Sequence, residues 1–299
     1  MPAGASMIRP ATQPSKSAFR QWIPVGFHVV RDLPYLARGS RSQTLDVYLP
    51  DKATAPRPLM VWIHGGGWNS GDKSFPPGLG LLLHGYVVAS IDYRLSREAV
   101  FPAQIYDCKA AIRFLRAHAR QFDADPTRIG VWGCSAGGQL AALLGTTNGL
   151  KEYEGLEGPL GVSSNVQAVC DWFGPSDFLQ WKDLSGSGAT VVSQFLGGIL
   201  SANSMAARFA SPAEQAGRCA AVPFLIMHGD RDVVVPARQS QILFERLRKA
   251  GAPVTLIVLA HAGHGNGWFK SREDLHRVYD FFDRCFESSP VHILPTTRP

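Results

Sequence analysis

Ser135, in the segment Gly133-Cys134-Ser135-Ala136-Gly137, has the surroundings that a catalytic nucleophile requires. An apolar, β-rich run at residues 129–132 enters this segment, and an Ala/Leu-rich run at residues 139–144 leaves it. Glycines two residues on either side of a serine allow a strand to turn abruptly into a helix, which strains the serine backbone and exposes its hydroxyl at the edge of a sheet. The spacing therefore predicts a serine nucleophile suited to acyl transfer.

A nucleophilic serine needs a base that takes its proton and a carboxylate that orients the base. His264 is the favoured base, because it lies between two glycines in a loop after the last predicted strand; His261 is its nearest rival. Asp232 is the favoured carboxylate, whereas Asp230 is expected to stabilise the turn of the same loop. The order Ser135, Asp232, His264 is one in which such a triad occurs on a mostly parallel sheet.

Three consecutive glycines follow His64, directly after a predicted strand at residues 59–63. Because no side chain blocks the approach, the backbone N–H groups of Gly66 and Gly67 can point toward an incoming carbonyl. The amide of Ala136, next to the nucleophile, is expected to supply a third donor. These amides are the predicted oxyanion hole.

Other residues near these motifs have weaker claims to a role in the chemistry. Cys134 is expected to be packed away, and His228 to pack or bond locally. Asp92-Tyr93-Arg94 and Asp107 are expected to tie loops to a helix. The aromatic candidates for substrate binding are Trp68, Trp172, Phe173 and Trp268, with Trp181 as a further candidate; for each of them a place in the core is the alternative.

Short β-rich runs alternate with helical patterns, which predicts an α/β fold with a mostly parallel, doubly wound sheet and helices on both faces. An apolar stripe from Ile105 to Phe122, at spacings of three and four, predicts one covering helix. Leu243, Leu247 and Ala250 predict another, and a C-terminal helix follows around residues 275–285. The predicted strands are residues 45–49, 59–63, 87–91, 129–132, 166–171, 224–227 and 254–259.

The length of 299 residues fits one large domain, which we place at residues 41–287. Residues 1–40 lack clear periodicity and are expected to form an N-terminal extension, and residues 288–299 a C-terminal tail. A glycine- and serine-rich stretch at about 177–211 predicts a small cap insertion between a strand and a helix.

Composition excludes several classes of partner and cofactor. The net charge is +6, but Lys and Arg are spread along the chain, which favours a solvated surface over binding to nucleic acid or membrane. Five cysteines without a C-x-x-C spacing indicate reduced thiols and no metal site. Because neither a leader nor a long apolar run is visible, a cytoplasmic location is expected. The sequence leaves open whether the chain forms a homo-oligomer.

Four segments, at residues 64–68, 133–138, 228–236 and 263–265, together resemble the α/β-hydrolase carboxylesterases, particularly the bacterial feruloyl and acetyl xylan esterase-like group. The hormone-sensitive-lipase-like esterases are related but usually carry a larger helical cap ahead of the first segment. The resemblance spans about residues 40–287. It implies an α/β-hydrolase fold and cofactor-free hydrolysis of small-molecule esters with short acyl or aryl-acyl groups, through an acyl-enzyme.

Two residues depart from the pattern of that group: Gln139 stands where we expect His, and His261 where we expect Gly. They bear on substrate preference and leave the reaction class intact. Two rival functions remain at this point. One is a serine peptidase similar to prolyl oligopeptidase, and the other is a ligand-binding homologue that has lost catalysis.

Overall fold

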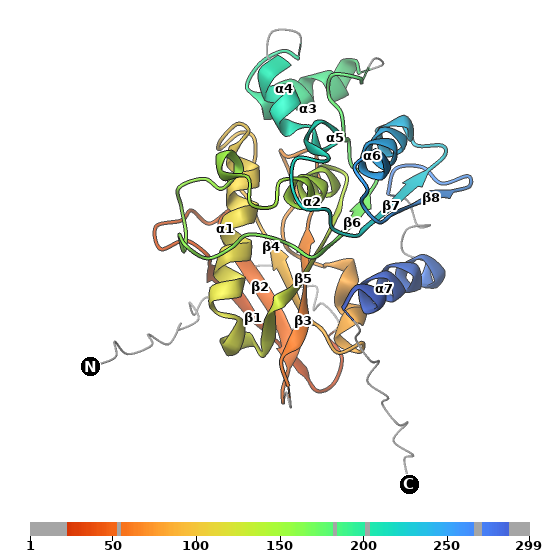
Figure 1. The fold of residues 1–299 in the computed structure, drawn as a ribbon. Helices are drawn as coiled ribbons and strands as arrows, with labels where there is room; N and C mark the ends of the chain where they lie inside the picture. The colour runs from red at the N-terminus through yellow and green to blue at the C-terminus, as the bar shows by residue number, and fades with distance from the viewer. Residues whose placement is uncertain (1–22, 53–54, 182–183, 201–203, 266–270, 287–299) are drawn as a thin grey trace.

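An eight-stranded sheet forms the centre of the molecule (Figure 1). The computed structural model describes residues 23–52, 55–181, 184–200, 204–265 and 271–286. Across the sheet the strand order is β1-β2-β4-β3-β5-β6-β7-β8; β2 pairs antiparallel with β1 and β4, and the other described pairs are parallel. The strands are β1 (Phe27–Pro34), β2 (Thr44–Pro50), β3 (Arg57–Ile63), β4 (Val87–Ile91), β5 (Ala124–Cys134), β6 (Ala168–Trp172), β7 (Phe224–Gly229) and β8 (Val254–Leu259). The predicted mostly parallel sheet is confirmed.

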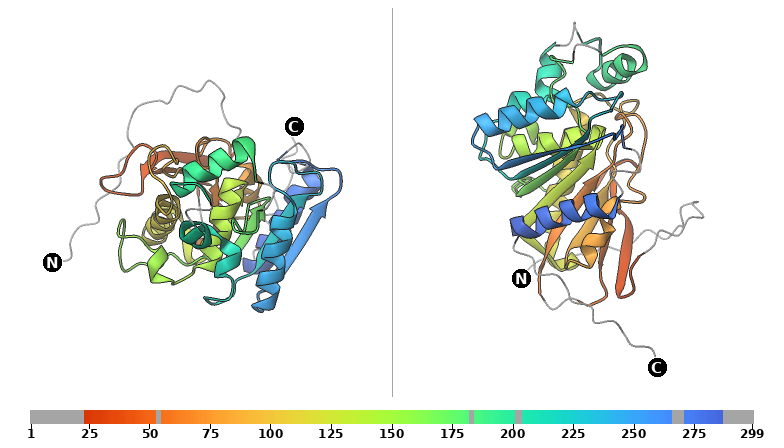
Figure 2. Two further views of the ribbon diagram at one scale, coloured as in Figure 1. Left: turned by 90° about the horizontal axis from the view of Figure 1, so that it is seen from above. Right: turned by 90° about the vertical axis from the view of Figure 1, so that its right-hand side faces the viewer.

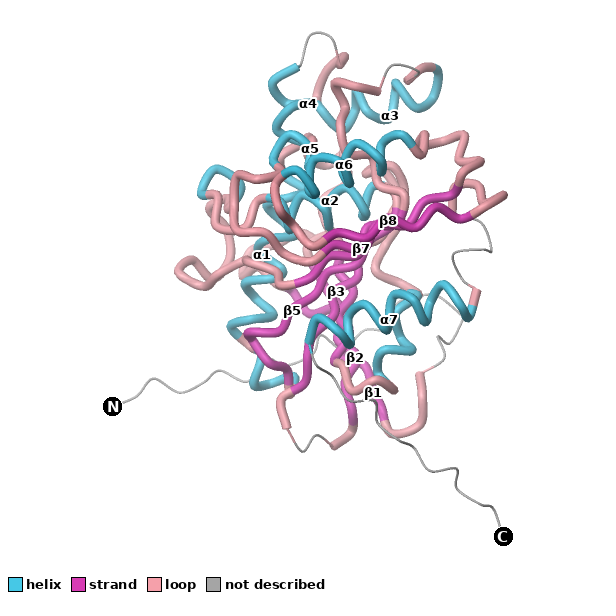
Figure 3. Tube along the Cα trace, turned by 45° about the vertical axis from the view of Figure 1, so that its right-hand side comes forward, coloured by secondary structure: helices cyan, strands magenta, loops and turns pink. Residues whose placement is uncertain are grey.

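Helices cover both faces of this sheet (Figures 2 and 3). The helices are η1 (Pro77–Leu82), α1 (Ala103–Ala117), η2 (Ala119–Phe122), α2 (Ala136–Thr146), η3 (Lys151–Tyr153), α3 (Gly186–Leu196), α4 (Ser204–Ala210), α5 (Pro212–Gln215), α6 (Arg238–Lys249) and α7 (Arg272–Phe286). Alternate side chains of a strand point to opposite faces, so Val61 of β3 packs in one apolar cluster with α1, α2 and α6, whereas Met60 and Trp62 pack in a second cluster with α7 and η1. The doubly wound arrangement is confirmed as well.

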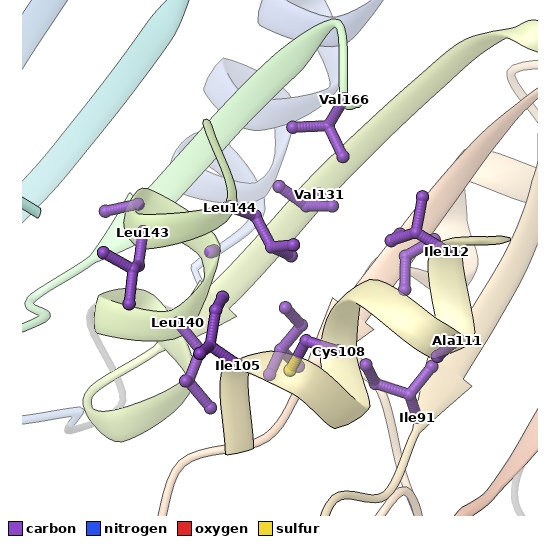
Figure 4. Packing of buried hydrophobic residues seen from close by; sticks show 14 of the residues in the cluster. Ile91, Ile105, Cys108, Ala111, Ile112, Val131, Leu140, Leu143, Leu144 and Val166 are labelled. Carbon is purple, nitrogen blue, oxygen red and sulfur yellow. The ribbon is translucent and has the colours of Figure 1, made fainter. Parts of the chain in front are cut away.

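The first cluster joins α1 and α2 to the sheet (Figure 4). Ile105, Cys108 and Ile112 project from α1 and Leu140 and Leu144 from α2, and all five side chains are fully buried. Burial of a large aliphatic side chain contributes roughly 1.5–3 kcal/mol. This packing holds α2, and with it the residue that precedes α2, at a defined height above the strands.

The apolar stripe predicted for α1 continues beyond the helix itself. α1 ends at Ala117, and the separate 3-10 helix η2 follows before Asp123 adopts a left-handed conformation with φ 52°. At the end of α1, the backbone amide of His118 donates a hydrogen bond to the carbonyl of Phe114 at 3.0 Å, and the ring nitrogen Nδ1 of His118 bonds the same carbonyl at 2.8 Å. The apolar stripe stays buried on both sides of the break between α1 and η2, so the periodicity of the sequence could not reveal this break.

Strand β1 lies in the segment where the sequence predicts no regular element. It pairs with β2 from Phe27 to Pro34, so the sheet begins inside the segment that we assigned to an N-terminal extension. The pairing register shifts between Val30 and Leu33, and Asp32 has φ 54°. This irregularity breaks the alternation of apolar and polar residues by which a strand is recognised.

Helices α3 and α4, called the cap helices below, lie between β6 and β7 and project beyond the carboxyl ends of the parallel strands (Figure 1). They fall inside the segment 177–211, where the sequence predicts a cap insertion. None of the described helices combines the length and the apolar character that a membrane span requires.

Candidate active site

Ser135 occupies the sharp turn between β5 and α2. Its φ of 54° and ψ of −120° are strained for a residue with a side chain. The flanking glycines leave no room for larger residues: a Cβ atom on Gly133 would lie 2.1 Å from the carbonyl oxygen of Gly137, and one on Gly137 would lie 2.1 Å from that of Ile63. The amide of Ser135 donates a hydrogen bond to the carbonyl of Trp172 on the neighbouring strand, at 2.8 Å. The turn therefore presents the serine hydroxyl at the carboxyl edge of the sheet.

The structure brings Ser135, His264 and Asp232 together in a hydrogen-bonded line. His264 Nε2 lies 2.9 Å from Ser135 Oγ, and His264 Nδ1 lies 2.7 Å from Asp232 Oδ2. A carboxylate only accepts, so Nδ1 carries the hydrogen and Nε2 is left to accept the serine proton. The geometry is that of a nucleophile, a base and an orienting acid.

Asp232 is held as an ion by four donors. Its Oδ1 accepts hydrogen bonds from the amides of Val234 and Val235 at 2.8 and 2.9 Å, and its Oδ2 lies 3.2 Å from His228 Nε2 in addition to the contact with His264. Burial raises the pKa of Asp232, but the hydrogen bonds from His228, His264 and Val235 lower that pKa by a larger amount. The net pKa therefore lies well below the ordinary value of an aspartate.

The two rivals for these positions lie elsewhere. Asp230 is exposed in the turn after β7, where its amide donates a hydrogen bond to the carbonyl of Leu259 at 3.1 Å. His261 is exposed in a left-handed conformation with φ 62°. Neither residue lines the cavity beside Ser135.

The predicted oxyanion loop passes close to the nucleophile. A Cβ atom on Gly65 would lie 2.9 Å from the carbonyl oxygen of Cys134 and 3.3 Å from Ser135 Cβ. Gly66 and Gly67 have φ of 107° and 60°, and both line the same cavity as Ser135. Ala136 begins α2, where backbone N–H groups lack helical partners and the helix dipole favours negative charge. Amides from both segments thus border the space in which an oxyanion would form.

His64 supports this loop as a neutral, buried side chain. Its Nδ1 donates a hydrogen bond to the carbonyl of Gly65 at 2.7 Å, and its ring stacks on Tyr93 at 4.3 Å. The hydroxyl of Tyr93 in turn donates to the carbonyl of His64 at 2.9 Å. Burial lowers the pKa of His64 to about 4, so it remains uncharged at neutral pH.

A cavity of about 800 Å³ opens beside Ser135. Three of the four predicted substrate-binding residues, Trp68, Trp172 and Phe173, line it, while Trp268 lies outside the described residues. Phe173 also packs edge-on against the ring of His264, with centroids 4.7 Å apart. The lining includes further residues that sequence reasoning did not identify: Trp62, Asn69, Phe75, Pro77, Pro175, Ser187, Gly188, Val191, Val192, Val234, Val235 and Leu275. No Asp, Glu, Lys or Arg occurs among the described lining residues.

The prediction that Cys134 is packed away holds only in part, because its side chain packs against the second apolar cluster without being fully buried. Cys134 is half-buried and borders the cavity. Space for its thiol exists because Gly65 has no side chain: a Cβ atom there would lie 3.1 Å from Cys134 Sγ. Among the described residues, no group of His, Cys, Asp and Glu side chains is arranged to hold a metal ion.

The BD-FAE family model matches residues 45–247, which include the serine turn, the glycine loop and Asp232. This chain belongs to the BD-FAE family. It is 36% identical over 235 residues to the esterase LipC of Mycobacterium tuberculosis, covering 75% of this chain and 57% of LipC. It is 30% identical over 249 residues to the esterase LipQ of the same organism, covering 78% of this chain and 56% of LipQ. The chain thus spans a little over half the length of these curated relatives.

A truncated carbohydrate esterase from gut microbiota has a similar structure. The two structures superpose with a TM-score of 0.80 at 33% sequence identity, covering 87% of this chain and 97% of that protein. This likeness confirms the α/β-hydrolase fold.

In this BD-FAE family member, polar residues outside the triad connect loops, as predicted. The guanidinium of Arg94 donates two hydrogen bonds to Asp107, at 2.8 and 2.7 Å, and the carboxylate of Asp92 accepts one from the amide of Lys73 at 2.6 Å. His228 bonds locally, with Nδ1 2.7 Å from Ser240 Oγ. The contact between His228 and Asp232 was not predicted from the sequence.

Proposed function

We propose that this chain is a serine carboxylesterase. Ser135 Oγ attacks the ester carbonyl while His264 Nε2 accepts the hydroxyl proton, and the amides of Gly66, Gly67 and Ala136 hold the oxyanion. His264 then gives the proton to the leaving alcohol, and an acyl group remains on Ser135. Water attacks this acyl-enzyme with His264 again as base, which releases the acid and restores the serine.

The observation that carries this proposal is the continuous hydrogen-bonded path from Ser135 through His264 to Asp232, at 2.9 and 2.7 Å. The cavity borders one end of that path, so a bound ester would meet the serine and the oxyanion loop together. The names of the relatives LipC and LipQ, both esterases, agree with this chemistry.

We infer that the substrates are uncharged esters with short acyl or aryl-acyl groups, of feruloyl or acetyl type. Six Trp and Phe side chains line the cavity and offer flat apolar surface to such groups: Trp62, Trp68, Phe75, Trp172, Phe173 and Trp181. The likeness to a carbohydrate esterase favours an ester on a sugar. The residues proposed for the reaction require no cofactor.

The test is hydrolysis of p-nitrophenyl acetate by Ser135→Ala and His264→Ala variants. We expect a loss of at least about a thousandfold in kcat/KM for each, because the triad acts as a unit. Ser187→Ala is the matched control, since Ser187 lines the same cavity and is not bonded to His264. Full activity in either triad variant would refute the assignment.

A substrate panel decides between the proposed function and its rivals. The panel contains p-nitrophenyl esters of increasing acyl length, methyl ferulate, acetylated xylan and a prolyl peptide. We expect the highest kcat/KM on short acyl or feruloyl esters. A preference for the peptide would assign the chain to the peptidases, and binding without turnover of any member would assign it to the inactive ligand-binding homologues.

A further inference from the structure

Gln139 is a fully buried polar residue that the proposed reaction does not use. It lies one helical turn after the nucleophile, and its amide donates a hydrogen bond to the carbonyl of Ser135 at 3.0 Å. Its side chain makes two further hydrogen bonds in opposite directions. Oε1 accepts from the indole N–H of Trp68 at 2.9 Å, and Nε2 donates to the carbonyl of Ala210 at 2.7 Å.

Chemistry fixes the orientation of this amide. An indole N–H only donates and a backbone carbonyl only accepts, so the carboxamide oxygen must face Trp68 and the carboxamide nitrogen must face Ala210. Both partners are therefore satisfied by one short, uncharged side chain. Gln139 is one of the two positions where this sequence departs from the pattern of the carboxylesterases that it resembles.

Trp68 is the residue through which Gln139 reaches the oxyanion loop. It directly follows Gly67 and has φ 57°, and its carbonyl accepts a hydrogen bond from the amide of Ser96 at 2.7 Å. Its ring stacks on Phe195 of α3, with centroids 4.2 Å apart and planes 13° from parallel. Trp68 thus lies between the oxyanion loop and a cap helix, and its indole N–H is held from α2.

We propose that Gln139 is a positioning residue that sets the placement of the oxyanion loop relative to Ser135 and joins both to the end of α4. This inference rests on the proposed esterase function. The helix that carries Gln139 begins beside Ser135, so a bond from that helix to Trp68 fixes the nucleophile and the amides of Gly66 and Gly67 in one frame. Misplacement of such groups by about 1 Å can cost a hundredfold in rate.

The test compares Gln139→Leu with Gln139→His on p-nitrophenyl acetate at pH 8. Leucine fills the space but makes neither hydrogen bond, so we expect kcat to fall roughly tenfold to a hundredfold with KM within about twofold. A neutral imidazole can accept from one partner and donate to the other. The histidine variant should therefore recover most of the lost kcat, which a merely space-filling role does not predict.

A double-mutant cycle with Trp68→Phe tests the pathway. Phenylalanine keeps an aromatic ring at this position but lacks the N–H group, so Trp68→Phe should lower kcat. Combined with Gln139→Leu it should cost little beyond the larger single effect, because both changes remove the same bond. Additive losses would overturn the proposed pathway.

Tyr153→Phe is the matched control for the cap side of the link. The hydroxyl of Tyr153 donates to the carbonyl of Phe209 at 2.9 Å, one residue before the carbonyl that Gln139 holds, and Tyr153 is equally buried. We expect this variant to lose stability and to keep wild-type kcat.

The two proposals fail in different ways. If Gln139→Leu lowers the melting temperature as Tyr153→Phe does and leaves kcat unchanged, the positioning role is refuted while the function stands. If Ser135→Ala retains activity, the proposed function itself is refuted.

Discussion

At the scale of single residues, Asp232 shares one oxygen between two histidines. Oδ2 lies 2.7 Å from His264 Nδ1 and 3.2 Å from His228 Nε2. His228 Nε2 also lies 2.8 Å from the carbonyl of Val235, which can only accept, so this nitrogen carries a hydrogen. His228 is therefore a donor that draws negative charge away from the oxygen facing His264.

Removing that donor should change the pH dependence of the reaction. An asparagine at position 228 can reach Ser240 but not Asp232, so Asp232 would hold a protonated His264 more strongly. We expect His228→Asn to move the acidic limb of the kcat/KM profile to higher pH by about 0.4 to 1 pH unit, the equivalent of one hydrogen bond.

Two variants control this measurement. His228→Gln restores an N–H near the position of Nε2 and should return the limb toward the wild-type position. Ser240→Ala removes only the partner of Nδ1, at 2.7 Å, and should leave the limb in place. An unshifted profile in His228→Asn would show that His228 is structural only.

The sequence predicted that Ser135, Asp232 and His264 come together, and the structure places them in hydrogen-bonding contact, but the residues that hold them in place were not predicted. Ser135, Asp232 and His264 stand in motifs whose spacing reflects their chemistry. The contact of His228 with Asp232 and that of Gln139 with Trp68 depend on which side-chain atoms face each other after the chain has folded. No periodicity encodes such contacts.

At the scale of elements, the first turn of α2 fits against β3 without spare volume. A Cβ atom on Gly137 would lie 2.1 Å from the carbonyl of Ile63 and 2.5 Å from that of His64. These are backbone atoms, so α2 itself would have to move. We expect Gly137→Ala to lower kcat/KM about a hundredfold or more, because the displaced helix carries Ser135 with it.

Gly145→Ala is the matched control on the same helix. A Cβ atom there would lie 2.5 Å from Val169 Cγ2 and 2.8 Å from Phe224 Cζ, which are side-chain atoms far from the nucleophile. We expect thermal unfolding to report a loss of stability while kcat/KM stays within about threefold, since surface and core changes remote from a site act mainly on folding. Equal losses of kcat/KM in both variants would contradict the local explanation.

Predictions of elements succeeded where patterns were regular. The strands from residue 45 onward and the three helices with apolar stripes occur in the structure, with ends that differ by a few residues. β1 was missed because its register shift breaks the alternation. A cap insertion was predicted from glycine and serine content, but the stacking of Phe195 on Trp68 joins distant segments and could not be read from composition.

At the scale of the whole molecule, a buried carboxyl group makes stability depend on pH. Asp171 is 1% exposed, and one of its oxygens has no hydrogen-bond partner among the described residues. Burial raises the pKa of Asp171 from 3.8 to about 6, although a hydrogen bond from the amide of Gly174 opposes the shift. The folded protein therefore keeps this proton over a range of pH in which the unfolded chain releases it.

The sign of the effect follows from that difference. Stability contributed by protonated Asp171 is complete below the unfolded pKa of 3.8 and is lost as the pH rises through the folded pKa of about 6. The Asp171→Asn variant has no carboxyl group at this position, so it does not lose this stability as the pH rises. The difference between its free energy of unfolding and that of the wild type should therefore increase by up to about 3 kcal/mol from pH 4 to pH 7, measured by urea denaturation. Parallel curves for the two proteins would contradict the assignment.

The cavity beside Ser135 is lined, among the described residues, without a single acidic side chain, lysine or arginine, although the chain as a whole carries a net charge of +6. Dissolved ions screen the attraction between charges and leave apolar contact nearly untouched. Binding of a neutral ester in this cavity involves no attraction between charges, so the affinity should not fall as the ionic strength rises. Added sodium chloride should therefore weaken the attraction of the positively charged exterior to negatively charged surfaces. The concentration of an uncharged ester that half-saturates the cavity should stay the same.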